Sequence, residues 1–297
     1  MGLAVGDALG ASVETLAESR FAPVTGYLAG GSFRHPAGAW TDDTAMALCL
    51  ADSLAETDRF DASDLLYRFC RWAELGENTS TGVCIGAGKN TLRALGQFRR
   101  TGSLEAPHFG RHGDGNGALM RLAPVAIRFR DEPALAVAVA ALQSRTSHAS
   151  KISEACCAFA ADLMRRLILG DPWKDAIDAA YGSANPAVRL RLSEALLSEK
   201  PPSTGYVADM LQAAIWATAG CGTFADAVLL AVNLGGDADT IGAVTGQIAG
   251  ARWGYLAIPQ EWRSELVLAD NVLAASERLI SRRPGGRHGV ITTGARA

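Results

Sequence analysis

Two short clusters of acidic and hydroxyl side chains offer the clearest chemistry in this chain, and each stands directly before an apolar stretch. The first, Thr41 to Thr44, precedes the run 45–54, and the second, Asp237 to Thr240, precedes the run 241–250. Two glycines at 235–236 allow a tight turn ahead of the second cluster. Asp and Thr are also preferred at helix N-termini, where they accept backbone N–H bonds and face the positive end of the dipole. Each cluster alone therefore has two interpretations, a helix cap or a set of ligands.

The two clusters together favour the ligand interpretation, because one helix cap needs only one such residue. If the two helix starts meet in the folded chain, the four carboxylates of the clusters lie together. Like charges that close force protonation unless a cation neutralises them. Oxygen ligands without nearby His or Cys suit Mg²⁺ or Mn²⁺ rather than zinc. The paired clusters thus predict a site for a hard divalent cation.

A third polar segment, His112 to Met120, alternates glycines with other residues just before an apolar run. Its glycines, Gly113, Gly115 and Gly117, expose backbone N–H groups of the kind that bind a pyrophosphate. A plain glycine turn is the alternative interpretation. The spacing and the preceding strand of a dinucleotide-binding fold are both missing, so a Rossmann domain is not indicated.

Composition and charge narrow the function classes. The chain has 297 residues, of which 48% are hydrophobic, and a net charge of −3, so it can bury a large core and has no electrostatic basis for binding nucleic acid. Its six cysteines form no C-x-x-C pair and are expected to be reduced and buried. The longest apolar run, 134–142, is far too short to cross a bilayer, and the first residues lack the features of a signal peptide. We expect a cytoplasmic monomer without membrane contact.

The first element that must position the clusters is a glycine-striped helix. Gly2, Gly6 and Gly10 recur every four residues, which on a helix makes a smooth face for close packing against another helix. Asp7 and Glu14 share a face if that helix continues far enough. The glycine- and proline-rich stretch that follows, up to Trp40, has no periodicity and is expected to be a loop, long enough for a lid, that leads into the first cluster.

The rest of the chain is also predicted to be helical. No stretch alternates like a strand, and alanine is abundant. We therefore expect an all-α protein with one helical domain over 1–281 and a disordered, glycine-rich tail over 282–297. Helical periodicity recurs at 61–75, 83–98, 118–129, 153–169, 172–181, 186–197, 206–219, 224–232 and 261–280.

Four motifs resemble those of the ADP-ribosylglycohydrolases in order and spacing. They are GLAVGDALGASVE at 2–14, WTDDTAM at 40–46, GDGNGALMR at 113–121 and VNLGGDADTIGAVTGQIAGA at 232–251. The resemblance covers almost everything up to about Pro259, and the bacterial members of the family include the dinitrogenase reductase-activating glycohydrolase. It implies a single compact orthogonal helical bundle with a central binuclear metal cleft, which holds two Mg²⁺ ions or, in some members, Mn²⁺.

The resemblance also implies roles for individual residues. Glu14 matches a glutamate on a mobile segment near the metals and is a candidate for proton transfer, while Asp43 or Asp239 orients the attacking water. The residues that match metal ligands are Thr41, Asp42, Asp43, Asp237, Asp239 and Thr240. The residues that match the family's ADP-ribose-binding loops are Gly113, Gly115, Asn116, Gly117 and His148.

The activity implied is hydrolysis of the N- or O-glycosidic bond that joins ADP-ribose to a protein side chain or another acceptor. The partner is then an ADP-ribosylated protein or a small ADP-ribosyl substrate, and nucleic acid enters only as an ADP-ribosylated acceptor. A module that binds ADP-ribose without cleaving it is the alternative. A metal-dependent isoprenoid synthase needs a third aspartate where Met46 stands, and we discount it.

Two departures from the family pattern matter. Relatives usually have about a turn or more of helix before GLAVGDALG, whereas this chain starts on that motif, so we expect a shortened first helix. Gly86 stands where we place an acid of many bacterial relatives. Loss of an acid there removes a proton donor, which predicts slow release of a poor leaving group such as the guanidine of arginine.

Overall fold

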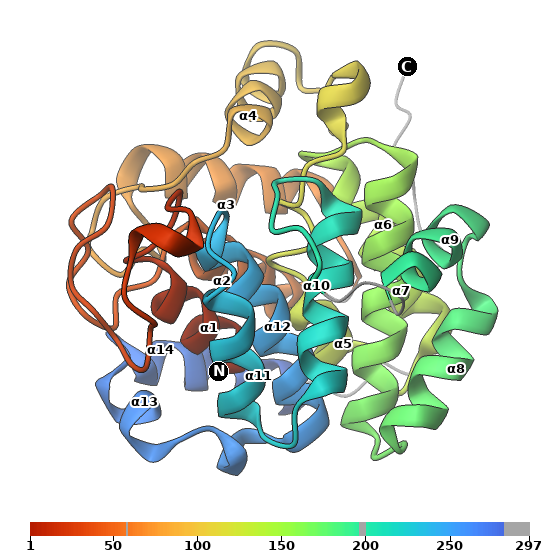
Figure 1. The fold of residues 1–297 in the computed structure, drawn as a ribbon. Helices are drawn as coiled ribbons and strands as arrows, with labels where there is room; N and C mark the ends of the chain where they lie inside the picture. Colours follow the sequence, from red (N-terminus) through yellow and green to blue (C-terminus); the bar gives the residue numbers. More distant parts are fainter. Residues whose placement is uncertain (58, 196–199, 282–297) are drawn as a thin grey trace.

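The computed structural model describes residues 1–57, 59–195 and 200–281, and over these residues it is helical, with isolated β-bridges but no sheet (Figure 1). This confirms the all-α prediction; the tail 282–297 lies outside the described residues. The α-helices are α1 (Gly2–Gly10), α2 (Asp42–Glu56), α3 (Ala62–Leu75), α4 (Lys89–Thr101), α5 (Ala123–Arg128), α6 (Pro133–Arg145), α7 (Lys151–Ile168), α8 (Trp173–Ser183), α9 (Pro186–Ala195), α10 (Val207–Gly220), α11 (Phe224–Val232), α12 (Ala238–Trp253), α13 (Gln260–Glu265) and α14 (Ala269–Ser281).

The centre of the fold is the pair α1 and α12, which are packed backbone against backbone. A Cβ atom on Gly6 would lie 1.9 Å from the carbonyl oxygen of Gly242, and one on Gly242 would lie 2.1 Å from that of Gly6. Gly2 and Gly246 face each other in the same way one turn along. Only glycine permits so close an approach. The predicted glycine stripe is therefore confirmed, and its partner is a second stripe on α12.

Helix α1 is shorter than a helix that would carry both Asp7 and Glu14. It ends at Gly10, and a series of turns follows up to Thr15, whose φ is +69°. The chain is held there by backbone bonds to the turn before α12: Thr15 N–H donates to Gly236 O at 2.7 Å, and Gly236 N–H donates to Leu16 O at 2.7 Å. These tertiary bonds take the place of a continued helix, and they place Glu14 beside the start of α12.

Helix boundaries elsewhere differ from the periodicity where glycine or a tertiary bond intervenes. The run 83–98 becomes helical only at Lys89, after Gly86 with φ +83°. The run 118–129 is helical only over α5, because the preceding residues form turns. The run 261–280 is divided into α13 and α14 by Leu268, with φ +51°.

Helices α2 and α12 are buried on nearly every side, so the acidic clusters at their starts sit deep in the helical core. The loop between α1 and α2 leads into Thr41 as predicted, and it contains a turn closed by paired backbone bonds between Gly30 and His35. None of the described helices is both long and apolar enough to cross a membrane.

Candidate active site

The first turn of α2 is capped by another helix, not by its own side chains. Asp7 of α1 is fully buried, and its carboxylate accepts the backbone N–H of Thr41 at 2.9 Å and that of Thr44 at 3.0 Å. It also accepts the hydroxyls of Thr41 at 2.9 Å and Thr44 at 2.6 Å. Asp7 therefore satisfies two of the free N–H groups of this helix start, at Thr41 and Thr44, so the side chains of Asp42 and Asp43 are not needed for these bonds.

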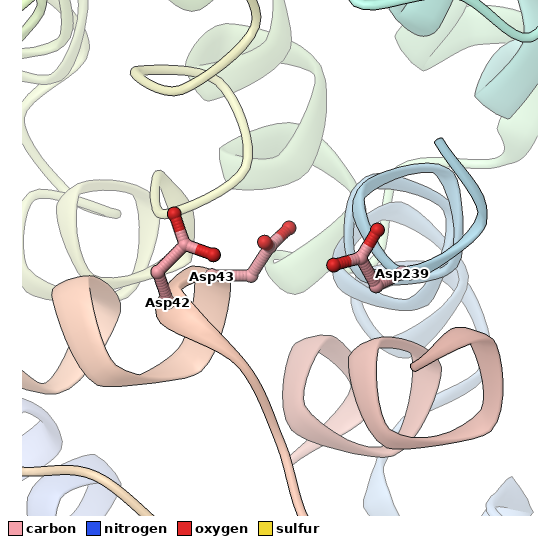
Figure 2. Close-up of side chains that lie close together, drawn as sticks. All are labelled: Asp42, Asp43 and Asp239. Carbon is pink, nitrogen blue, oxygen red and sulfur yellow. The ribbon is translucent and has the colours of Figure 1, made fainter. Parts of the chain in front are cut away.

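The cap interpretation of the two clusters is not supported by the structure. Thr41 and Asp237 occupy the N-cap positions of α2 and α12, and neither makes a side-chain capping bond. Meanwhile the carboxylate oxygens of Asp42, Asp43 and Asp239 approach within 4.8 Å of one another. Figure 2 shows these three side chains reaching toward one another from the starts of α2 and α12. The two helix starts meet, as the sequence predicts.

Hydroxyl groups join the two halves of this carboxylate cluster. The Thr41 hydroxyl lies 3.3 Å from Asp43 Oδ2 and 3.2 Å from Asp239 Oδ2. The Thr240 hydroxyl lies 3.4 Å from Asp43 Oδ2. One oxygen each of Asp43 and Asp239, the Oδ1 atoms, is buried with no hydrogen-bond partner among the described residues. Such orphaned anionic atoms are costly in a protein interior unless a cation satisfies them.

The pKa values of the clustered carboxylates also indicate a cation site. Burial, followed by repulsion from neighbouring carboxylates, raises the pKa values of Asp42, Asp43 and Asp239 well above their usual range. A divalent cation would reverse this effect by favouring the ionised forms. Five hydroxyl and carboxyl side chains, all buried, offer only oxygen ligands: Thr41, Asp42, Asp43, Asp239 and Thr240. This donor set fits Mg²⁺ or Mn²⁺.

Asp237 and Glu14 lie at the edge of the cluster. Asp237 is half-buried and outside the group of three close carboxylates, and its Oδ2 accepts the amide of Asn116 at 2.7 Å. Glu14 is also half-buried, and its pKa is raised to about 7 by burial and then by the charges of Asp237 and Asp7. Near neutral pH, Glu14 can therefore both hold and release a proton.

The predicted anion-binding loop at 113–117, called the glycine cradle below, lies next to this edge. Its loop is bonded to the segment before α10, since Asn116 N–H donates to Gly205 O at 3.2 Å and Val207 N–H donates to Asp114 O at 2.9 Å. The bond from Asn116 to Asp237 then connects the cradle to the acidic cluster. The structure thus brings the predicted anion site and the predicted metal site together.

His148 packs closely against the glycines of the cradle. Its imidazole is buried, and a Cβ on Gly117 would lie 2.6 Å from its Cε1 atom, while one on Gly115 would lie 3.0 Å from its Nε2 atom. Burial and the nearby Arg121 lower the pKa of His148 to about 3, so the ring is neutral. The imidazole supports the loop, and it is one physical reason that glycine stands at both positions.

The backbone at Gly86 gives a reason for glycine there that does not depend on the loss of an acid. Its φ of +83° favours glycine, and a Cβ would lie 2.2 Å from Asp42 Oδ1. No side chain fits there without displacing the Asp42 carboxylate. The sequence reasoning also missed Asp7 and Arg121 as site residues. Their signal was present, since each is a charged residue inside an otherwise small or apolar part of a matched motif.

Comparison with known proteins decides the family. A model of the family described as ADP-ribosylglycohydrolase matches residues 1–288. The chain belongs to the ADP-ribosylglycohydrolase family. It is 37% identical to the ADP-ribosylarginine hydrolase Tri1 of Serratia proteamaculans, over 96% of this chain and 78% of that one. It is 33% identical to the ADP-ribosyl-[dinitrogen reductase] glycohydrolase of Rhodospirillum rubrum, over 90% and 88%.

A solved structure agrees with this family assignment. The protein titled "ADP-ribosylglycohydrolase-related protein complex" superposes with a TM-score of 0.82 at 39% identity, over 94% of each chain. The resemblance seen in the four motifs is thereby confirmed. This ADP-ribosylglycohydrolase is a glycosidic-bond hydrolase that removes ADP-ribose, and neither a non-catalytic module nor an isoprenoid synthase is favoured.

Proposed function

We propose that this ADP-ribosylglycohydrolase releases ADP-ribose from arginine side chains of a protein and requires two Mg²⁺ ions. The observation that carries the metal part is the buried group of Asp42, Asp43 and Asp239, with orphaned oxygens and raised pKa values. The acceptor is inferred from two relatives named ADP-ribosylarginine hydrolase, which are 37% and 34% identical to this chain. The positive φ of Gly86 and its closeness to the Asp42 carboxylate explain glycine there without the loss of an acid, so we follow the two named relatives and not the expectation of slow arginine release.

In this proposal the metal ligands are Thr41, Asp42, Asp43, Asp237, Asp239 and Thr240, with Mn²⁺ able to replace Mg²⁺. When bound, the ions would hold the hydroxyls of the distal ribose and lower the pKa of the attacking water. The chain's own residues do the rest. Asp7 fixes the start of α2 and so holds Asp42 and Asp43 in place. Asp43 of α2 and Asp239 of α12 orient the attacking water.

Proton transfer falls to Glu14, the half-buried carboxyl group at the edge of the cluster. The leaving guanidine must gain a proton, and Glu14 is placed to supply one. The backbone N–H groups of Gly113, Gly115 and Gly117 bind the diphosphate, and Asn116 orients the cradle through its bond to Asp237. His148 acts through the loop that it supports.

The experiment is a release assay on arginine-linked and serine-linked ADP-ribosyl peptides, with Mg²⁺ or with chelator. We expect release from arginine in Mg²⁺ and none in chelator. Asp42→Asn and Asp239→Asn abolish release because each removes a charged ligand. Asp178→Asn on the exposed face of α8, where Asp178 pairs with Lys174, is the matched control and keeps full activity. Equal release in chelator would overturn the metal assignment, and release from serine alone would overturn the acceptor.

Two further expectations remain proposals. We expect the enzyme to be a monomer and to act in the cytoplasm on an ADP-ribosylated protein. Sedimentation of the purified chain and fractionation of cells that express it would test these two points.

A further inference from the structure

Arg121 is a buried cation without an acidic partner. It follows the glycine cradle, it is completely inaccessible to solvent, and none of the described carboxylates lies within salt-bridge distance of it. Burying a charge without a counter-ion costs several kcal/mol. The unpaired charge of Arg121 lies directly beside the predicted anion-binding loop, since Arg121 bonds to Gly117.

Every contact of the Arg121 guanidinium is to a neutral group. Nε donates to Gln143 Oε1 at 2.9 Å, and Nη1 donates to Gly117 O at 3.0 Å. Nη2 donates to Gln143 O at 2.9 Å and lies 3.3 Å from the Thr146 hydroxyl. The guanidinium also lies over the ring of Phe69, 4.7 Å from its centroid. The hydrogen bonds fix the position of the charge, but none of them cancels it.

The positive charge of Arg121 acts on two residues of the candidate active site, His148 and Asp42. It contributes, after burial, to the lowered pKa of His148, which packs against Gly115 and Gly117. It also interacts electrostatically with Asp42. Because Arg121 bonds directly to the cradle carbonyl of Gly117 in a dry interior, its charge is screened little by salt or water.

We propose that Arg121 is the counter-charge for the substrate's diphosphate, acting from beneath the cradle without touching the ligand. The uncompensated cation makes the backbone N–H groups of Gly113, Gly115 and Gly117 a stronger anion site than a glycine loop alone. This inference rests on the proposed function, because it takes the cradle as the diphosphate site. Arg121 is accordingly a positioning and electrostatic residue, not a catalytic one.

A purely structural role for Arg121 is the competing explanation, and Gln143 offers a matched pair of variants that separates the two. In Gln143→Glu and Gln143→Met the side chain no longer donates to Ala118 O, a bond of 3.0 Å. Met also loses the acceptor of Arg121 Nε, which Glu keeps, so the second pair of variants below is needed beside this one. Only Gln143→Glu places a carboxylate against the guanidinium and cancels its charge. Arg121→Lys and Arg121→Met form a second pair, in which both lose the guanidinium fork and only lysine keeps a cation.

The test is calorimetric binding of ADP-ribose, with adenosine as the probe that lacks the diphosphate, measured at millimolar concentration by ligand-observed NMR. We expect Gln143→Glu to bind ADP-ribose roughly 10- to 100-fold more weakly than Gln143→Met, the range expected for cancelling one unit charge near the ligand. Adenosine binding should be equal in the two variants. Arg121→Met should likewise lose more ADP-ribose affinity than Arg121→Lys.

Equal ADP-ribose affinities within both pairs would overturn the inference while leaving the proposed function intact. Parallel losses for ADP-ribose and adenosine would also overturn it, since they indicate a structural strut. If the wild-type enzyme bound ADP-ribose no more tightly than adenosine, both the inference and the assignment of the cradle would fail.

Discussion

Substituting Gly6 by alanine tests whether the active site depends on the contact between α1 and α12. The added Cβ would lie 1.9 Å from Gly242 O, whereas ordinary contacts begin near 3.4 Å, so the helices must part locally by roughly 1.5 Å. Overpacking of this kind costs about 1–3 kcal/mol or more, and alanine's helix preference returns about 0.5–1 kcal/mol. We expect a net loss of about 2 kcal/mol, or roughly 4–8 °C in Tm for a chain of this size.

The same displacement separates Asp7 on α1 from Asp239 on α12, so Mg²⁺ affinity should fall with stability. Gly250→Ala is the control, because its Cβ would meet Gly2 Cα at an ordinary 3.5 Å. That variant should match or slightly exceed the wild type in Tm. Calorimetric scans and Mg²⁺ titrations measure both quantities. A Gly6→Ala protein with the wild-type Tm and Mg²⁺ affinity would refute the close-packing argument.

Three further predictions concern the site itself. Gly86→Asp should lower Tm and weaken Mg²⁺ binding, because the backbone there is strained for any residue other than glycine and the new side chain meets Asp42. Increased activity of this variant toward arginine-linked substrate would contradict the prediction. Gly117→Ala should weaken ADP-ribose binding about tenfold or more by displacing the loop from His148. Gly182→Ala, at a position with open space around it, should leave ADP-ribose binding unchanged. Equal ADP-ribose affinities of the two variants would count against the cradle. Without Mg²⁺, the raised pKa values of Asp7, about 6, and Glu14, about 7, stabilise the fold at low pH, and this contribution is lost as pH rises through 6–7. The lowered pKa of His148 makes the fold more stable as pH rises, and it does so equally with and without metal. Mg²⁺ removes only the loss of stability that the metal-free carboxylates cause as pH rises. The Tm gained on adding Mg²⁺ should therefore grow from pH 5 to pH 7.5, and a gain independent of pH would contradict the electrostatic account.

The sequence predicts well those features that follow from local pattern. Polar residues mark the two helix starts in the sequence, and the structure brings these two starts together. The glycine stripe of α1 is visible in the spacing of Gly2, Gly6 and Gly10, because only a helix brings these residues to one face. Motif resemblance adds the ligand set, which spacing alone leaves open between cap and ligand.

The missed features depend on contacts between distant parts of the chain. Asp7 caps a helix that begins 35 positions later, so its charge inside a small and apolar motif marks it as unusual but does not reveal its partner. Arg121 is defined by its bonds to Gln143, 22 positions away. Gly86 is defined by a positive φ and by the carboxylate of Asp42, and neither is encoded in its neighbours. Tertiary packing decides these three positions.

The central claim is that the meeting point of α2 and α12 holds two divalent ions. Anomalous diffraction from crystals soaked in Mn²⁺ tests it most directly, because the ion's position is observed without reference to activity. The account predicts two peaks within ligand distance, about 2.0–2.3 Å, of oxygens from Asp42, Asp43 and Asp239, with Asp237 completing the set. Absence of any peak beside these carboxylates at saturating Mn²⁺ would contradict it.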